Sequence, residues 1–382
     1  MLKKELMGAL AMIGVIAPFT AHADQSMSST PAQPAYTAGE MLRTGDLPGA
    51  YNQNASYKLN DSYDVYFTAD FIYWNLQQDL VRVGNLITTS SAGALGLLTG
   101  TDEIVFSDGK YTPGFQVGLG FNMKGMDDWN LYTEYTWYQN KHSRSVNAED
   151  GQVIGLFYAQ EGAPSGITDD IVVAETATTK SKYHYNNLNI SLERPFYFGR
   201  KLTANFGAGL RGLWVSQTVT NVASGLTSYH SGEVTEEALG SSAGTSFHQK
   251  MWGIGPRFEF GANWLLGLGF RMMTDVAASV LYSRYTDLSG SVSGSATHGV
   301  TAAFNTSISS NYNTLRAITE TSLGLGWGTY FGDNSDFHFD LSASYEFNVY
   351  WNQNMLDMVI NGHGSPGNTY LHGLNVAARF DF

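Results

Sequence analysis

The chain has 382 residues, a formal net charge of −13 and no cysteine. Its acidity excludes nucleic acid as the natural partner, because neutralising phosphates needs clustered Lys and Arg. The missing cysteine excludes disulfides and thiolate metal sites. Only 14% of the residues are charged, below the usual quarter, and the abundant Tyr, Phe and Gly favour strands in an apolar environment.

The first residues have the features of an export signal. Lys3 and Lys4 precede an apolar run that ends at Phe19, and Ala21-His22-Ala23 has the small-x-small form of a signal-peptidase site. We therefore predict a cleaved signal over residues 1–23. A retained membrane anchor is the alternative, but the apolar run is shorter than the ~18–20 residues that a spanning helix needs.

Residues 24–62 are rich in Ser, Pro, Ala and Gln and have no apolar period. This composition is typical of a disordered segment. We predict a periplasmic tail or a plug segment here, followed by a single outer-membrane barrel domain over residues 63–382.

The clearest structural signal is the stretch Phe337–Trp351. Its odd positions are apolar from Phe337 to Trp351, and its even positions are mostly polar. Side chains alternate between the two faces of a strand, so one face is continuously apolar. A strand of fifteen residues climbs roughly 38 Å at a tilt near 40°, enough to cross the apolar band of an outer-membrane barrel.

Nine further segments repeat this pattern, and the connections between the ten alternate between long and short. That alternation is typical of a transmembrane antiparallel up-and-down β-barrel, with short periplasmic turns and long extracellular loops. We predict an all-β fold of about ten strands. Twelve to fourteen stay open because of weaker runs such as Val153–Tyr158. The predicted strands are Tyr63–Asn75, Pro113–Met123, Trp129–Asn140, Tyr183–Arg194, Lys201–Gln217, Phe247–Trp264, Gly269–Tyr285, Tyr312–Tyr330, Phe337–Trp351 and Thr369–Phe382.

All tryptophans lie near predicted strand ends, which indicates the aromatic girdles of a membrane barrel. Trp74 has the parity of the polar face and needs either a local bulge or an inward ring. The chain stops on Phe382, after a strand in which Phe380 also belongs to the apolar face; this resembles the C-terminal signal that the barrel assembly machinery reads. The predicted girdle consists of Trp129, Trp137, Trp214, Trp252, Trp264, Trp327 and Trp351.

Nearly all charges on the predicted strands have the parity of the inner face. The acids outnumber the arginines there, which favours a mildly cation-attracting pore. The alternative, equally weighted on residue types, is that these groups pair with one another inside a filled barrel. The predicted pore-lining residues are Asp70, Glu134, Glu193, Arg211, Arg257, Glu259, Arg271, Asp275, Arg316, Glu320, Asp340 and Glu346, and the same parity places Arg379 and Asp381 inside.

Two motifs could suggest other chemistry. Gly207–Gly212 fits G-x-G-x-x-G, but the residues that follow continue a strand period, whereas a dinucleotide site needs a helix there. A barrel hydrolase would need an acid beside a histidine such as His184, His248, His298 or His363. Asp169, Asp170 and Asp357 are candidate acids, but no spacing singles out a pair. We therefore expect no enzyme, no cofactor and no metal site.

Several blocks also resemble a known family. Phe67–Trp74, Pro113–Phe121, Trp129–Tyr138, Leu188–Trp214 and Gly253–Phe270 are similar to the pore-forming major outer membrane proteins of Legionella and of environmental relatives of the chlamydiae. The resemblance implies an outer-membrane β-barrel with porin-like activity. The absence of cysteine departs from the disulfide-linked major proteins of the chlamydiae proper.

The predicted function is passive diffusion of small hydrophilic solutes through the outer membrane of a Gram-negative bacterium. Ten strands lie between the filled eight-stranded barrels and the open channels of sixteen or more, so the path is narrow or gated. The alternative is a structural or adhesive surface barrel with a closed lumen. The expected partners are outer-membrane lipid, the assembly machinery, and small solutes or ions, with a homo-oligomer left open.

Overall fold

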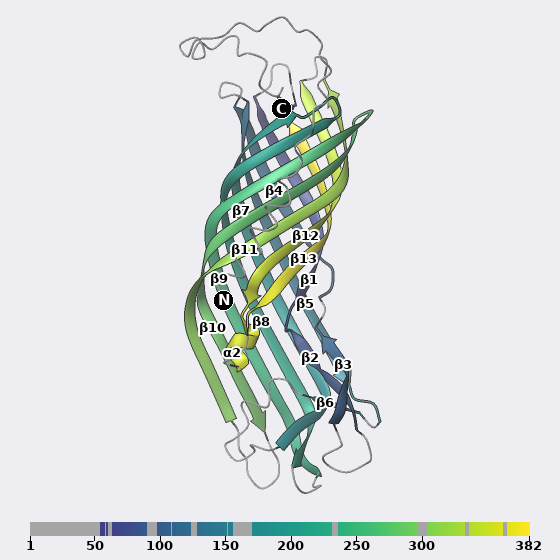
Figure 1. The fold of residues 1–382 in the computed structure, drawn as a ribbon, viewed down its shortest axis with the longest axis vertical. Helices are drawn as coiled ribbons and strands as arrows, with labels where there is room; N and C mark the ends of the chain where they lie inside the picture. Colours follow the sequence, from purple (N-terminus) through teal and green to yellow (C-terminus); the bar gives the residue numbers. More distant parts are fainter. Residues whose placement is uncertain are drawn as a thin grey trace, which may run out of the picture. The chain divides into compact units, whose positions relative to one another are not determined.

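A closed ring of ten antiparallel strands dominates the structure (Figure 1). The computed structural model describes residues 54–57, 59, 63–89, 98–107, 109–123, 128–150, 152–155, 170–230, 236–295, 304–332, 336–361 and 365–382. The chain divides into two units, and all of these residues belong to the unit Asn54–Phe382. Within the ring, each strand pairs with the ring strands before and after it in the chain.

The strand bounds are as follows. The ring consists of β1 (Val65–Gln78), β4 (Thr112–Met123), β5 (Trp129–Asn147), β7 (Asp170–Tyr197), β8 (Leu202–His230), β9 (Glu236–Gly267), β10 (Phe270–Ser295), β11 (Phe304–Phe331), β12 (Phe337–Asn354) and β13 (Gly367–Asp381). A short side sheet of β3 (Leu98–Phe106), β2 (Arg82–Thr89) and β6 (Gln152–Gly155) joins the ring where β6 pairs with β7.

The first and last strands close the ring. β1 pairs with β13 from Tyr66 to Gln78, with Phe67 opposite Phe380. The amide of Phe382 donates to the carbonyl of Val65 at 3.1 Å. Closure leaves the ring with no unpaired strand edge, as lipid requires. The predicted ten-stranded up-and-down barrel is therefore confirmed, and the weak run near Val153 became β6 outside the ring.

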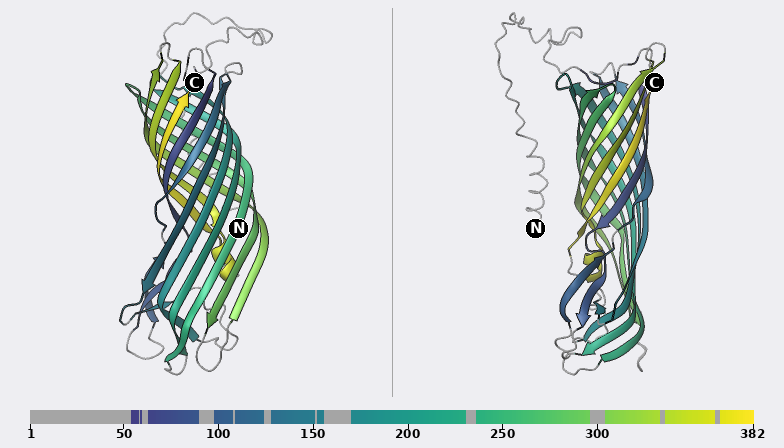
Figure 2. Two further views of the ribbon diagram at one scale, coloured as in Figure 1. Left: turned by 180° about the vertical axis from the view of Figure 1, so that it is seen from behind. Right: turned by 90° about the vertical axis from the view of Figure 1, so that its right-hand side faces the viewer.

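Six ring strands continue well beyond the ends that the sequence predicted, including β5, which ends at Asn147 instead of Asn140. β7 begins at Asp170 and β8 ends at His230, while β9, β10 and β11 are extended in the same way. Figures 1 and 2 show these strands running past β1, β12 and β13, beside the small side sheet. The prediction of long polar loops here was wrong for the parts that form these extensions.

The extensions were missed because the apolar face of each strand changes sides along its length. In β8, Leu210 and Trp214 point outward, whereas beyond Trp214 the buried residues are Val215 and Val219 and the outward ones are Ser and Thr. The same change occurs in β9, which runs in the opposite direction: buried Phe247 and Met251 precede outward Trp252 in the chain. The outer face of each strand meets lipid on the periplasmic side of this point and water on the extracellular side. The apolar residues therefore change from the outer to the inner face.

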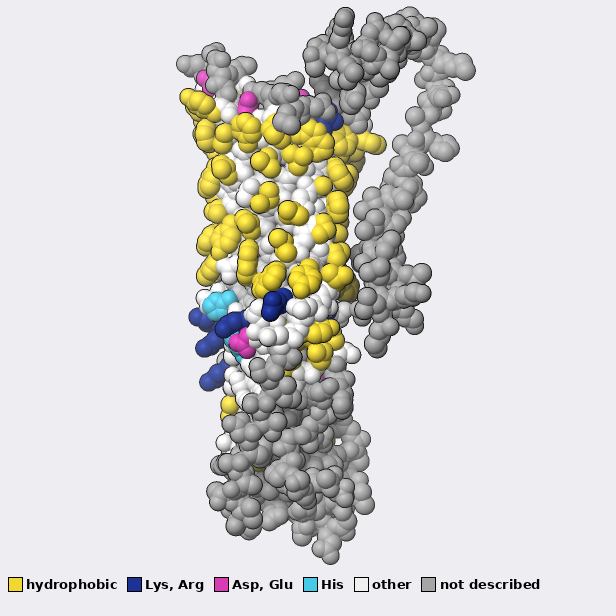
Figure 3. Space-filling view, turned by 90° about the vertical axis from the view of Figure 1, so that its left-hand side faces the viewer, with side chains coloured by type: hydrophobic (Ala, Val, Ile, Leu, Met, Phe, Trp, Pro, Cys, Tyr) yellow, Lys and Arg dark blue, Asp and Glu magenta, His cyan; other side chains and the backbone are white. Residues whose placement is uncertain are grey.

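A belt of apolar side chains covers the outer surface of the barrel (Figure 3). Leu323, near the middle of the part of β11 that pairs with β12, is 61% exposed, as expected for a side chain that lipid would cover. The seven predicted girdle tryptophans all have partly or largely exposed side chains at the two ends of this belt. Trp74 is only 2% exposed and lies inside, which is the inward alternative.

The described residues include one helix, α2 (Leu356–Asn361), which follows β12 and lies among the buried residues inside the barrel (Figure 1). Asn352, with a φ of 56°, interrupts the pairing of β12 with β13. Asn tolerates this left-handed conformation better than most residues, and it turns the chain inward. In the described part of the chain, no helix is long and apolar enough to cross a membrane.

The lipid-facing belt predicts a specific response to charge. Leu323→Arg places a cation near the middle of the membrane and is expected to lower the free energy of unfolding by roughly 2–4 kcal/mol. Leu268→Arg is the control, because Leu268 is 93% exposed in the turn between β9 and β10. Urea titrations of both variants in lipid vesicles measure the difference, and equal stabilities would contradict the lipid-facing assignment.

Candidate functional site: a charged cavity in the barrel

The membrane-spanning half of the barrel encloses a polar cavity of about 280 Å³. Seven carboxylates and one guanidinium line it, together with several Asn and Gln side chains. The charged lining residues are Asp70, Glu134, Glu193, Glu259, Asp275, Glu320, Glu346 and Arg257. The formal charge of the lining is therefore 7 negative minus 1 positive, or −6.

Glycines in the wall make room for these side chains. A Cβ added at Gly207 would lie 2.5 Å from Oε1 of Glu259, and one added at Gly261 would lie 2.5 Å from Oδ1 of Asp275. Gly209 lies so close to β7 that its Cβ would meet the carbonyl oxygen of Ile190 at 2.0 Å. The G-x-G-x-x-G match therefore lies in the middle of strand β8, where the glycines shape the cavity wall.

On one side of the cavity, two arginines share the carboxylate of Glu320. Nη2 of Arg211 donates to both carboxylate oxygens of Glu320 at 2.7 Å, and its Nε donates to Asn189 at 2.9 Å. Arg257 also pairs with Glu320, at 3.2 Å, and with Glu259. Arg211 is 1% exposed, so its charge depends on Glu320 for compensation.

Four other cavity carboxylates form no ion pair with a described Lys, Arg or His side chain. Asp70 and Glu346 both accept hydrogen bonds from Nδ2 of Asn375, at 3.4 and 2.7 Å. Glu134 accepts from Asn189 at 3.2 Å, and Asp275 accepts from Ser322 at 3.0 Å. Amide and hydroxyl donors orient these oxygens, and none of these hydrogen bonds brings in a positive charge.

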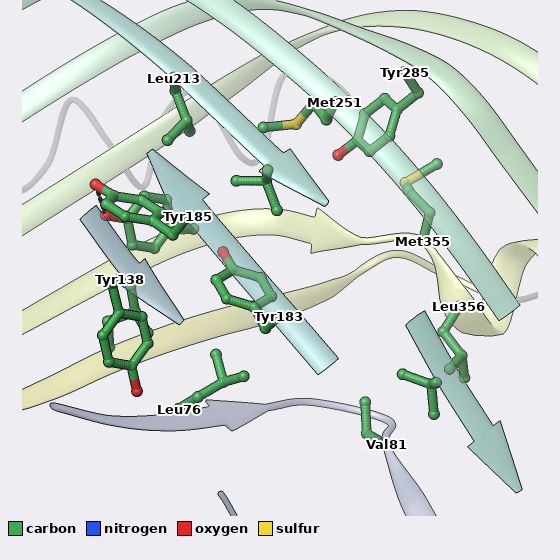
Figure 4. Packing of buried hydrophobic residues seen from close by; sticks show 14 of the residues in the cluster. Leu76, Val81, Tyr138, Tyr183, Tyr185, Leu213, Met251, Tyr285, Met355 and Leu356 are labelled. Carbon is green, nitrogen blue, oxygen red and sulfur yellow. Dashed lines mark hydrogen bonds between the residues drawn. The ribbon is translucent and has the colours of Figure 1, made fainter. Parts of the chain in front are cut away.

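On the side of the cavity away from the periplasmic turns, an apolar cluster occupies the barrel interior (Figure 4). The hydroxyl of Tyr350 on β12 donates to that of Tyr185 on β7 at 2.7 Å. These strands are five steps apart in a ring of ten, so opposite walls touch. Figure 4 shows Tyr183 and Tyr185 on one side of the cluster and Met355 and Leu356 on another.

Hydrogen bonds hold the inward segment before α2 in this position. Gln353 accepts from Tyr183 at its side chain, at 3.1 Å, and from Tyr285 at its carbonyl, at 2.9 Å. The amide of Met355 donates to Gln249 at 3.3 Å. Met355 and Leu356 are thus fixed inside the barrel by partners on β7, β9 and β10.

Besides the cavity and the apolar cluster, a third group of interior contacts lies at the end of the barrel with the short turns. In an outer-membrane barrel this end faces the periplasm. Asp381 accepts from Arg379 at 2.6 Å and pairs with His338 at 3.0 Å. Tyr57, which precedes the first ring strand, stacks on His338 with ring centroids 3.7 Å apart. Burial raises the pKa of Tyr57 to about 12, so its phenol stays protonated at neutral pH.

The structure brings eight of the twelve predicted pore-lining residues to the cavity. Of the other four, Arg211 pairs with Glu320, and Arg271 pairs with Asp340 toward the periplasmic end. Arg316 lies in the apolar cluster, where Nη2 donates to the sulfur of Met355 at 3.1 Å. No sequence pattern predicted the closure by Met355 and Leu356, because both residues lie within a predicted loop.

Two of the histidines considered for hydrolysis, His184 and His248, lie in the described part of the chain, and they contact residues other than the candidate acids. His248 pairs instead with Asp287, at 3.3 Å on the outer face, and accepts or donates a hydrogen bond with Thr218 at 2.9 Å. His184 contacts Gln139. His298, His363 and Asp169 lie outside the described residues, as does the side chain of Asp170.

The closed ring, the apolar belt and the charged interior define a transmembrane β-barrel protein of the outer membrane. The chain belongs to the family described as Legionella pneumophila major outer membrane protein precursor, whose profile matches residues 54–382. This confirms the family resemblance seen in the sequence. None of the curated proteins matches the chain.

Several solved outer-membrane proteins are similar to the chain at a low level. The outer membrane protease OmpT from Escherichia coli is 8% identical over 86% of this chain and 99% of that chain, with a TM-score of 0.36. The Ralstonia pickettii toluene transporter TbuX is 10% identical over 84% and 90%, with a TM-score of 0.27. A Pseudomonas aeruginosa FadL homologue is 10% identical over 83% and 89%, with a TM-score of 0.25.

The buried pair gives a prediction about stability. Arg211→Met leaves Glu320 with one cation instead of two and is expected to lower the free energy of unfolding by about 3 kcal/mol. Adding Glu320→Leu removes the buried carboxylate that has lost one of its two cations, and Arg257 keeps Glu259, so the double variant is expected to be more stable than Arg211→Met alone. Urea titrations in vesicles measure both, with exposed Lys201→Met as the control. A double variant less stable than Arg211→Met would overturn this account.

Proposed function

We propose that the protein is a narrow, gated outer-membrane channel that favours small cations and small hydrophilic solutes. The observation that carries this is the lining of the cavity, with a formal charge of −6 and four carboxylates that form no ion pair with a described Lys, Arg or His side chain. A ring of acidic side chains in a low-dielectric wall concentrates cations.

The apolar cluster gives this channel a closed state. Apolar constrictions exclude water and stop ions even when the gap is wider than the ion. Here the closure is made by side chains on separate elements, with Tyr185 on β7, Tyr350 on β12 and Leu356 on α2. Movement of the short α2 segment, together with rotation of the Tyr185 and Tyr350 side chains, would open a path without breaking the backbone hydrogen bonds of the ring.

The second candidate is a structural surface barrel that does not conduct. The contact between Tyr185 and Tyr350 across the ring favours it, because the interior is filled at that level. The charged cavity favours the channel, since a purely structural barrel gains nothing from several unpaired carboxylates. Electrical recording separates the two, because only the channel conducts.

Neutralising the unpaired acids tests the cation preference. Asp70→Asn, Glu134→Gln, Asp275→Asn and Glu346→Gln together reduce the formal charge of the lining from −6 to −2. The reversal potential of the variant in a planar bilayer under a KCl gradient is expected to fall to roughly half the wild-type value or less. Glu149→Gln with Asp150→Asn, exposed at the outer end of β5, is the control. An unchanged reversal potential would remove the charged wall from the mechanism.

A second variant tests the closure. Met355→Ser with Leu356→Ser makes the constriction polar, so water can enter it, and the single-channel conductance is expected to exceed that of the wild type. The control is Leu266→Ser with Leu268→Ser, an equal change at the periplasmic turn, where both side chains are exposed. If wild type and the Met355/Leu356 variant are both silent while folded, the structural alternative holds.

A further inference from the structure

A group of cations lies on the outer face of the barrel just beyond the apolar belt. Figure 3 shows Lys and Arg side chains gathered along the edge of this belt, over the long strands. We call this group the basic rim, and all its members are exposed. It consists of Lys141 on β5, Lys180 and Lys182 on β7, Lys250 on β9 and Arg284 on β10.

Strand register places these cations next to one another. Lys141 lies directly opposite Lys182, and Arg284 lies opposite Trp252. Between Lys182 and the cations of β9 and β10 runs β8, whose outward residues here are Ser216 and Thr218. The rim therefore combines five positive charges with hydroxyl groups on one surface, the donor set that binds phosphate.

The charges of the rim are poorly compensated by the protein itself. In the described part of the chain, Asp287 is the one carboxylate that pairs with it, at 3.6 Å from Lys250. Like charges directly opposite each other on neighbouring strands destabilise a sheet, as with Lys141 and Lys182. A chain with a net charge of −13 has ample acids, yet none of the described ones lies beside these two lysines.

The positive charges of the rim also act on a neighbouring histidine, His184. Burial and then the charges of Lys141 and Lys182 lower the pKa of His184. His184 lies one row beyond the girdle, opposite Gln139 and Ser216. It is therefore neutral at physiological pH, and it adds a hydrogen-bonding group to the rim without adding charge.

The height of the rim matches the position of lipid headgroups. Lys141 is four residues beyond Trp137 on β5, which corresponds to about 10 Å above the girdle at a tilt near 40°. Lys250 is two residues beyond Trp252, and Arg284 is in the same row as Trp252. Long cationic side chains in such places reach the interface with their charged ends.

We propose that the basic rim binds the phosphate groups of the lipid in the outer leaflet of the outer membrane, on the side of the barrel formed by β5 and β7–β10. A lipid is favoured over a soluble anion because the cations point away from the barrel interior and adjoin the aromatic girdle, so a ligand held there also contacts lipid-facing tryptophans. This site is independent of whether the barrel conducts.

The test uses the full-length protein refolded in neutral vesicles that contain either bisphosphorylated lipid A or lipid A with both phosphates removed. Binding is followed through tryptophan fluorescence, since Trp214 and Trp252 adjoin the rim. Wild type is expected to bind the bisphosphorylated form more tightly. Lys141→Gln with Lys182→Gln is expected to weaken this preference roughly thirty-fold, because each lysine contributes about fivefold at an anionic surface.

The matched control is Arg200→Gln with Lys201→Gln, which removes two exposed cations from the opposite end of the barrel and is expected to leave the preference unchanged. Migration of the folded barrel on gels shows that each variant is folded. Equal binding of the two lipid A forms by wild type, or an equal loss in both double variants, would overturn the proposal. Inorganic phosphate at millimolar concentration is expected to compete poorly, and displacement of the lipid by phosphate would identify a soluble anion as the ligand.

Discussion

The requirement that every backbone amide in lipid be hydrogen-bonded determines the architecture of this protein. A closed ring satisfies it, since β1 and β13 pair along their length and no edge remains. Because the backbone is satisfied within the ring, each side chain is free to match the medium that it faces. Phe67 and Phe380, opposite each other at the seam, are exposed on the outer face, while Asp70 of the same strand points to the cavity.

The media change along the strands, and the side chains change with them. Within the membrane, β8 places Leu210 outside and Arg211 inside; beyond Trp214 it places Val215 inside and Thr218 outside. The outer half of the barrel therefore packs like a soluble protein, with an apolar interior and a polar surface. This explains in one step why the closure above the cavity is apolar and why cations appear on the outer face only beyond the belt.

The same inversion explains what the sequence could and could not predict. Phe337–Trp351 keeps one phase throughout, so its strand and its lipid face were evident, and parity also placed Glu134 and Glu346 inside. In β7 the lipid face ends near Leu188, and beyond it Lys182 lies outside while Tyr183 is buried inside. The sequence pattern was followed only as long as the apolar residues stayed on one face, so the predicted strand began at Tyr183 and left Lys141, Lys180 and Lys182 in a loop. The available signal was the point next to a tryptophan where the apolar residues move from one face of the strand to the other, which would have predicted that the strand continues.

The closure by α2 had no comparable signal, because it depends on contacts between distant parts of the chain. Leu356 is apolar, but its position inside the ring is decided by Asn352, which turns the chain inward, and by Gln353, which bonds to tyrosines on β7 and β10. Those tyrosines have partners only once the ring has closed. The interior is therefore blocked by side-chain hydrogen bonds and apolar contacts, which can rearrange without breaking the backbone hydrogen bonds of the ring. The strength of the wall and the weakness of the closure are thus separate properties, as a gated channel needs.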